Sequence, residues 1–153
     1  MTNRSFRFFA IGVCAATLSV VTAAAPTGAP KKPTITVYKD PSCGCCKNWI
    51  EHLIKHGYRV DAKDSPDMAQ IKNTLGIPGD LKSCHTAVVG DYLIEGHVPA
   101  ADIDRLLATK PRVKGLAVPG MPMGSPGMEG PAKQHYQVLA FDRTGKAKVF
   151  ASY

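Results

Sequence analysis

The sequence of 153 residues lacks any run of basic side chains, although it carries 19 Lys and Arg against 12 Asp and Glu, for a formal net charge of +7. The lysines are spread along the chain, and no basic segment is interleaved with aromatic residues, which make up 7% of the composition. Clustered cations and interleaved aromatics are the usual marks of nucleic-acid binding. Without them we expect a solvated, mildly basic surface and no nucleic-acid partner.

The sequence also lacks a long hydrophobic run after its first 25 residues. A membrane-spanning helix needs about 20 consecutive apolar residues, so we expect no stable membrane insertion of the mature chain. The overall composition, with 44% hydrophobic and 20% charged residues, is that of a globular protein and not of a disordered one. The length favours one compact domain, and we find no internal repeat.

Residues 1–24 have the features of a secretory signal peptide. Arg4 and Arg7 supply the positive start, residues 8–21 form a short apolar core, and small residues follow where a signal peptidase would cleave. An uncleaved membrane anchor is the alternative interpretation. Residues 25–33, rich in proline and lysine, are predicted to form a linker. The signal predicts export of a domain that spans residues 34–153, with a bacterial periplasm as the expected location.

The exported part of the chain alternates between strand and helix signals. These signals predict a strand over 34–39, a helix capped by Ser42 and stopped by Gly57, a strand over 58–62, a helix over 65–75, a hairpin over 86–95, a helix from Pro99, a long loop over 116–131 and a last hairpin over 137–150. The order predicts an α/β, thioredoxin-like fold, with a central mixed sheet, flanking helices and a C-terminal β-hairpin extension.

Three cysteines fall within four residues, in the run Cys43-Gly44-Cys45-Cys46 at the predicted start of a helix. The positive end of a helix dipole favours the thiolate form of a cysteine. Two structural disulfides would be ordinary for four cysteines in an exported protein, but two of these cysteines are adjacent and two have a redox-type spacing. The cluster therefore indicates thiolate chemistry, and its position alone leaves both metal binding and disulfide exchange open.

Further soft ligands are expected to meet this cluster. Cys84 and His85 precede the predicted third strand, and in a thioredoxin-like fold that loop faces the start of the first helix. The predicted long loop adds three thioethers, and soft sulfur ligands select Cu(I), whereas Zn(II) or Ag(I) could occupy the same thiolates. Each donor also has a plainer interpretation: a strand-start residue bonded to backbone for the histidine, and gap filling for the thioethers. The candidate metal ligands are Cys43, Cys45, Cys46, Cys84, His85, Met121, Met123 and Met128.

The remaining imidazoles and the single tryptophan have plainer interpretations. His52 and His56 are spaced to chelate an ion, but they fall on a helix face that is expected to be solvated. His97 and His135 carry no spacing signal. Trp49 lies one helical turn beyond the cysteine run, and core packing is its expected role.

Several segments carry a resemblance to a known family, and they span the chain from about residue 34 to residue 153. They are Asp40-Pro41-Ser42-Cys43-Gly44-Cys45-Cys46 with Trp49, then Cys84-His85-Thr86, Glu95-Gly96-His97-Val98-Pro99, and Val118-Pro119-Gly120-Met121-Pro122 with the Gly-rich loop that follows. Together they resemble the CopG-type copper-resistance family of periplasmic, predicted metal-binding proteins. The resemblance implies a thioredoxin-like fold that binds several Cu(I) ions at the cysteines and contributes to copper tolerance. It also implies interconversion of Cu(I) and Cu(II) beside periplasmic efflux or chaperone proteins.

Two functions from different classes are therefore expected. The first is a periplasmic copper-binding protein with a Cu(I)–thiolate cluster, which would be a copper oxidoreductase if it also converts Cu(I) to Cu(II). The alternative is a thioredoxin-like thiol–disulfide oxidoreductase, with Cys43 as nucleophile and Cys46 as resolving thiol. A third interpretation, a structural module with its thiols oxidised into staples, predicts that the native protein has no free thiol.

Overall fold

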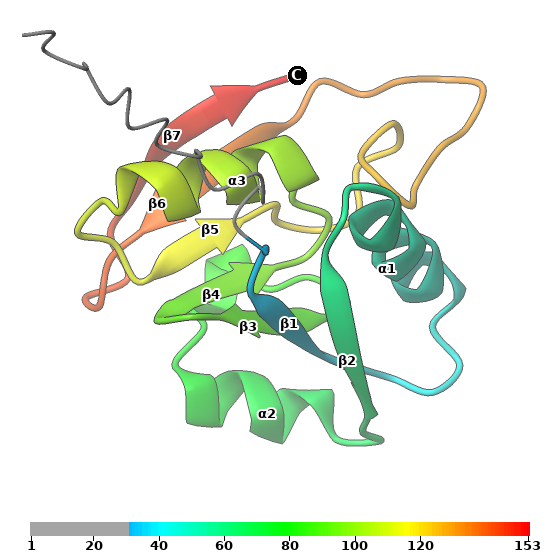
Figure 1. Ribbon diagram of the computed structural model, residues 1–153, viewed down its shortest axis with the longest axis horizontal. Coiled ribbons are helices and arrows are strands. Elements are labelled where there is room, and N and C mark those ends of the chain that lie inside the picture. Colours follow the sequence, from blue (N-terminus) through cyan, green and yellow to red (C-terminus); the bar gives the residue numbers. More distant parts are fainter. Residues whose placement is uncertain (1–30) are drawn as a thin grey trace, which may run out of the picture. The chain divides into compact units, whose positions relative to one another are not determined.

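The structure, a computed structural model, describes residues 31–153. The predicted signal peptide over 1–24 lies outside the described residues, and so does most of the predicted linker. Figure 1 shows the elements, which are β1 (Thr34–Lys39), α1 (Gly44–Lys55), β2 (Arg59–Asp64), α2 (Met68–Leu75), the short 3-10 helix η1 (Gly79–Leu81), β3 (Thr86–Val89), β4 (Tyr92–Glu95), α3 (Ala100–Thr109), β5 (Gly115–Ala117), β6 (Gln137–Phe141) and β7 (Ala147–Ser152).

The seven strands form one mixed sheet in the order β2-β1-β3-β4-β5-β6-β7. β1 and β2 run parallel with α1 between them in sequence, while β3 and β4 pair as an antiparallel hairpin. β6 and β7 form a second hairpin at the opposite edge of the sheet. The predicted α/β class, with its mixed sheet, flanking helices and C-terminal hairpin, is confirmed. The thioredoxin-like assignment within that class stays a prediction.

One element differs from the predicted long loop over 116–131. Residues 115–117 form the buried strand β5, which pairs parallel with β4 and antiparallel with β6. A side chain at Gly115 would place its Cβ 2.0 Å from the carbonyl oxygen of Leu93. The strand is only three residues long and begins with glycine, so it has too little alternation to be recognised from the sequence.

The two faces of the sheet carry separate apolar cores. Trp49 and Leu53 of α1 and Ile103 and Leu106 of α3 pack on one face, with the odd-numbered residues of β3. The other face carries a smaller core below α2 and η1, made of Ile77, Leu81, Leu93, Ala117 and Phe141. Figure 1 shows α2 on one side of the strands and α3 on the other. Because side chains of a strand alternate between the faces, consecutive residues of β3 serve different cores.

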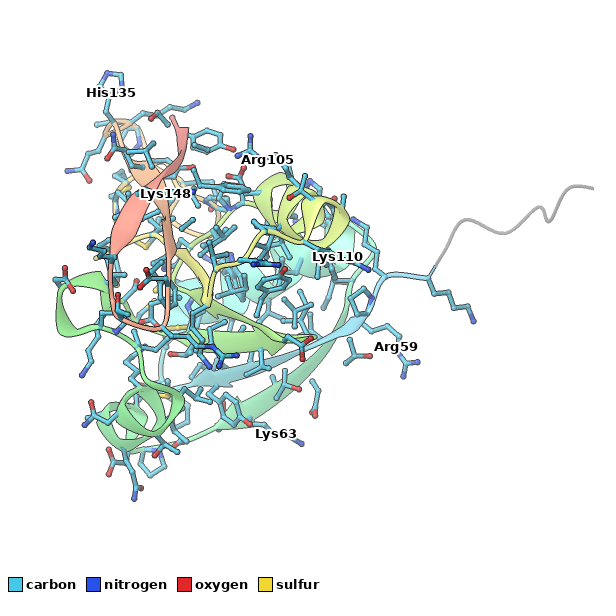
Figure 2. The ribbon with its side chains drawn as sticks, turned by 90° about the vertical axis from the view of Figure 1, so that its left-hand side faces the viewer. Arg59, Lys63, Arg105, Lys110, His135 and Lys148 are labelled. Atoms are coloured by element: carbon cyan, nitrogen blue, oxygen red, sulfur yellow. A yellow bond between two sulfur atoms is a disulfide. The ribbon has the colours of Figure 1, made fainter. Side chains whose placement is uncertain are left out.

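Four side chains, which we call the C-terminal clamp, attach β7 to α3. Asp102 accepts hydrogen bonds from Arg105 Nη2 at 2.7 Å and from the Tyr153 hydroxyl at 2.8 Å. The guanidinium carbon of Arg105 lies 4.0 Å from the ring centroid of Phe150, a cation–π distance. Figure 2 shows Arg105 on α3. These contacts hold the last strand of the chain on the helix that precedes β5.

The helix ends follow the local signals in the sequence. Gly57 and Gly76 follow α1 and α2 with φ of 84° and 72°, a left-handed backbone that favours glycine. Asp67 caps α2 by accepting from the backbone N–H of Gln70 at 2.8 Å. Within residues 31–153, no helix has the length and the apolarity that crossing a bilayer would require.

Candidate metal centre

The first turn of α1 positions three sulfur atoms. Cys43 is the N-cap residue, and its Sγ accepts a hydrogen bond from the backbone N–H of Cys46 at 3.3 Å. The prediction that Ser42 caps this helix is wrong, because the backbone N–H and the hydroxyl of Ser42 both donate to the carboxylate of Asp40. The turn formed by this carboxylate moves the helix start one residue along the chain. As a result, the three cysteines occupy the positive end of the helix dipole.

Cys43 and Cys46 are joined by a disulfide, whereas Cys45 and Cys84 are free thiols. The structure therefore represents an oxidised state of the Cys-x-x-Cys pair. Two free thiols remain in this state, which argues against the interpretation of all four cysteines as structural staples. A set of four thiolates requires prior reduction of the disulfide by two electrons.

Cys84 joins the three sulfurs from a segment far along the chain. Its Sγ lies 3.9 Å from Sγ of Cys45, which in turn lies 3.5 Å from Sγ of Cys43. The Sγ atoms of Cys43, Cys45, Cys46 and Cys84 all lie within 4.8 Å of one another, and we call this group the sulfur cluster. The structure thus brings the four predicted thiol ligands together, while their role as ligands stays a prediction.

Two buried imidazoles extend the site on the side of Cys84. Its Sγ lies 3.2 Å from Nδ1 of His85 and 3.1 Å from Nε2 of His97, and these three residues form a second group of potential metal ligands. Nδ1 of His97 must donate to the carbonyl oxygen of Pro126, 2.8 Å away, because a carbonyl only accepts. In the neutral ring Nε2 is then left with its lone pair facing Cys84. Fixing a histidine tautomer through the second nitrogen is the usual arrangement around metal sites.

Sequence reasoning missed His97, and one signal could have found it. The residue follows a glycine with φ of 70° and lies two positions before Pro99, which leads into α3, so no helical or strand periodicity marks it. The signal that could have found it is the family resemblance, which the segment around it carries.

The plainer interpretation of His85, a strand-start residue bonded to backbone, is met in part, because its carbonyl accepts from the N–H of Gly96 at 3.0 Å. The ring is fully buried, and its Nε2 has no hydrogen-bond partner among the described residues.

Burial controls the protonation of the donors. Burial raises the pKa of Cys84 to about 12, and the neighbouring Cys45 sulfur adds to this rise. Burial lowers the pKa of His85 well below its usual value, and the pKa of His97 is also lowered by burial. At neutral pH both rings are therefore uncharged and keep a nitrogen lone pair, whereas Cys84 is a thiol that must lose its proton on binding a metal.

Trp49 separates the site from the core. The residue is fully buried, its indole N–H donates to the carbonyl oxygen of Val98 at 2.9 Å, and its ring centroid lies 4.3 Å from that of His85. The expected role in core packing is confirmed. The same ring also packs against the imidazole of His85.

The Gly-rich loop that follows β5 lies directly on the first turn of α1. Besides the bond from His97 to Pro126, the loop approaches the helix at Gly127, where an added Cβ would lie 2.7 Å from the backbone nitrogen of Trp49 and 2.8 Å from the carbonyl oxygen of Cys45. A side chain at Gly127 would therefore collide with the helix backbone. The loop therefore packs on the backbone of α1 beside Cys45 and on His97.

The three methionines of this loop differ in environment. The side chain of Met121 is 53% exposed, and Met128 is partly buried. A Cβ at Gly130 would lie 2.5 Å from Sδ of Met123, so this sulfur packs against the loop itself. The role of Met121, Met123 and Met128 as copper ligands stays a prediction.

The histidine pair of α1 is not simply solvated. His52 is partly buried, and its Nε2 accepts a hydrogen bond from the backbone N–H of Ala100 at 3.1 Å, at the first residue of α3. The expectation that this side chain faces only solvent is therefore wrong: the start of α3 lies against this face of α1. His56 is exposed, as expected, and its Nδ1 lies 2.8 Å from the carbonyl oxygen of His52. His135 is also exposed.

Known proteins share both the sequence and the fold of this chain. The family model described as "Protein of unknown function, DUF411" matches residues 81–128, a range that contains Cys84, His85, His97 and the three loop methionines. Two solved structures are named "Copper resistance protein copG- Form 2" and "Copper resistance protein copG- Form 1". Each is 47% identical to this chain, and each alignment covers 80% of this chain and 98% of the solved chain. The TM-scores are 0.76 and 0.75, respectively. No curated protein matches significantly.

Proposed function

The chain belongs to the family of the CopG copper resistance proteins, and from this premise we propose that it binds copper at the sulfur cluster and contributes to copper resistance. The bound ion is Cu(I), because thiolate sulfur is the soft ligand that this ion prefers. Bridging thiolates allow few ligands to hold several ions, so we expect more than one copper per chain. The predicted signal peptide supports a periplasmic location for this function, with copper efflux or chaperone proteins as the expected partners.

The convergence of the sulfur cluster is the observation that supports this proposal most directly. Cys45 and Cys84 are separated by 39 positions in the sequence, yet their Sγ atoms lie 3.9 Å apart. Four sulfurs lie within 4.8 Å of one another, and two neutral, buried imidazoles lie beside Cys84, so the site gathers both sulfur and nitrogen donors. Nδ1 of His85, which lies 3.2 Å from Sγ of Cys84, is the nitrogen that an ion at this group would meet.

We further propose that the site supports both oxidation states of copper. The sulfur cluster suits Cu(I), and the imidazoles of His85 and His97 suit Cu(II). The Cys43–Cys46 disulfide adds a second redox element, because its two-electron reduction delivers two more thiols to the site. The protein would then act as a copper oxidoreductase: two Cu(II) ions each take one electron from the reduced Cys43 and Cys46 thiols, which form the disulfide and release two protons, and the reverse step oxidises two Cu(I) ions.

An anaerobic titration of the reduced protein with Cu(I), against a competing chelator, tests the proposal. We expect tight binding of more than one Cu(I), and loss of that binding in the Cys45→Ser Cys46→Ser variant. Asp102→Asn, in the C-terminal clamp, is the matched control and keeps the binding of the original chain. X-ray absorption on the loaded protein reports the oxidation state and the number of sulfur ligands. An absence of tight binding, or binding that survives the double substitution, contradicts the proposal.

The disulfide also favours a second candidate function. Cys43 and Cys46 are oxidised in the structure, with the spacing of a dithiol that exchanges disulfides. In this alternative Cys43 attacks a substrate disulfide and Cys46 resolves the mixed disulfide. Insulin reduction that persists after complete removal of metal, and that is lost in Cys43→Ser, would favour it. Equal activity with and without the Cys43 thiol would exclude it.

A further inference from the structure

A buried ion pair lies behind the segment that carries Cys84 and His85. Nζ of Lys72 in α2 lies 2.6 Å from Oε1 of Glu95 at the end of β4, and their side chains are 6% and 0% exposed. Two charges removed from water carry a large desolvation cost, so a buried pair is weak evidence of stabilisation by itself. The contribution of this pair therefore has to be sought in the groups that it holds in place.

Glu95 holds both ends of the segment that carries the two donors. Its Oε1 accepts from the backbone N–H of Ser83 at 2.6 Å, and its Oε2 accepts from the hydroxyl of Thr86 at 2.6 Å. Ser83 and Thr86 are the residues immediately before Cys84 and immediately after His85. Hydrogen bonds to an ionised acceptor are shorter and stronger than neutral ones. The carboxylate therefore fixes both ends of the segment from Ser83 to Thr86.

Lys72 fixes the carboxylate in turn. Its ammonium group also donates to the Thr86 hydroxyl at 2.9 Å, which leaves that hydroxyl hydrogen free to point to Glu95. Thr86 pairs with Glu95 in the antiparallel register of β3 and β4. Because strand residues alternate between faces, Thr86 meets the side of the sheet that carries α2. His85 lies on the other side, where its ring packs on Trp49.

We propose that Glu95, held by Lys72, is the positioning residue for Cys84 and His85 as copper ligands. The inference rests on the proposed function, because it concerns the geometry of the same site. Glu95 acts through the backbone and Thr86, from the opposite face of the sheet, and it touches no ion itself. Groups that hydrogen-bond a metal ligand directly contribute about 10- to 100-fold to metal affinity, and Glu95, which acts through the residues on either side of the ligands, is expected near the lower end of this range.

A double-mutant cycle for Cu(I) affinity tests the proposal. Glu95→Gln keeps the shape of the side chain and removes its charge, and we expect a loss of about tenfold or more in affinity. In a Cys84→Ser His85→Ala background, which lacks both positioned donors, Glu95→Gln is expected to leave the residual Cu(I) affinity unchanged. Asp102→Asn makes the same chemical change at another buried carboxylate, and we expect no effect on affinity in either background.

If Glu95→Gln does not fold, two variants of Thr86, the residue that donates to Glu95, provide the test. Thr86→Val removes the hydroxyl at nearly constant volume and is expected to weaken Cu(I) binding, whereas Thr86→Ser restores the hydroxyl and the affinity. Equal affinity in the original chain and in Glu95→Gln, or equal losses in both backgrounds, would overturn the inference. Failure of the original chain to bind Cu(I) is a different result and counts against the proposed function.

Discussion

Glu95 and Asp102 are both buried carboxylates with basic and hydroxyl partners, but they belong to regions with different tasks. Glu95 is fully buried and binds the two residues that flank Cys84 and His85. Asp102 is 3% exposed and binds Arg105 and Tyr153, which attach β7 to α3. The residue type and the burial are nearly the same in the two regions. What differs is the segment that each carboxylate holds.

This comparison separates stability from copper chemistry. Both regions contribute hydrogen bonds to charged groups, so a change in either one lowers the free energy of unfolding. Only the region of the sulfur cluster contains soft donors that face one another. Substitutions beside Cys84 should therefore change the copper affinity and the thiol reactivity, whereas substitutions in the C-terminal clamp should leave both unchanged.

The largest expected effect is on the reactivity of Cys84. Because burial and the Cys45 sulfur raise the pKa of Cys84 to about 12, we expect its alkylation by iodoacetamide at pH 8 to be about a thousandfold slower than that of a free cysteine. The rate should rise with pH, because the reactive thiolate gains population until the pH exceeds the pKa. Peptide mapping of the oxidised, metal-free protein measures this rate at each pH.

Two variants calibrate the measurement on Cys84. Cys45→Ser removes the repelling sulfur and should lower the midpoint of the pH profile, whereas Asp102→Asn should leave it unchanged. A midpoint at or below pH 9 would show that Cys84 is not held in the buried environment described above.

The next effect concerns the loop that covers the site. Gly127→Ala places a Cβ 2.7 Å from the backbone nitrogen of Trp49 at φ of 85°, while Gly57→Ala has almost the same φ of 84° and no atom within 4 Å. The backbone conformation alone costs about 1–2 kcal/mol. Overpacking should add about 1–3 kcal/mol at Gly127 only. Urea unfolding of the two variants measures the difference, and equal losses would mean that the loop does not press on α1.

A smaller effect is expected at the second imidazole beside Cys84. His97→Ala should weaken Cu(I) or Cu(II) binding by about 10- to 100-fold, because it removes the nitrogen that Pro126 orients toward the site. His52→Ala is the control, because it removes a partly buried imidazole of α1 that bonds the start of α3 and not Cys84. It removes the acceptor of the Ala100 N–H and should cost stability without affecting copper affinity. Chelator competition measures the affinity, and equal affinities in the two variants would remove His97 from the site.

The smallest expected effect is that of Asp102→Asn itself. The amide can accept only on one of its two positions, so the bond from either Arg105 or Tyr153 weakens, for a loss of about 1–2 kcal/mol in the free energy of unfolding. We expect no change in copper stoichiometry or affinity. A change in copper binding as large as that of His97→Ala would show that the two regions are energetically coupled.

Local patterns were sufficient for most of the secondary structure. The strand over 34–39, the hairpin over 86–95 and the helix before Gly76 follow from alternation, turn residues and caps, which act within a few positions of the chain. The cysteine run was recognised for the same reason. The N-cap differed because an Asp40 turn competes with the expected serine cap, and β5 was missed because its pairing partners, not its own sequence, hold it in the sheet.

The sequence alone determined the thiol-rich helix start, the methionines of the Gly-rich loop and the resemblance to a copper-resistance family. Only the tertiary structure decided that Cys84 joins the sulfur cluster, that His97 faces Cys84, and that Glu95 bonds the residues on either side of Cys84 and His85. The physical reason is the sequence separation over which the interactions act. Helix, turn and strand signals depend on neighbours within one or two turns, whereas a metal site depends on atoms that meet only after distant strands have paired.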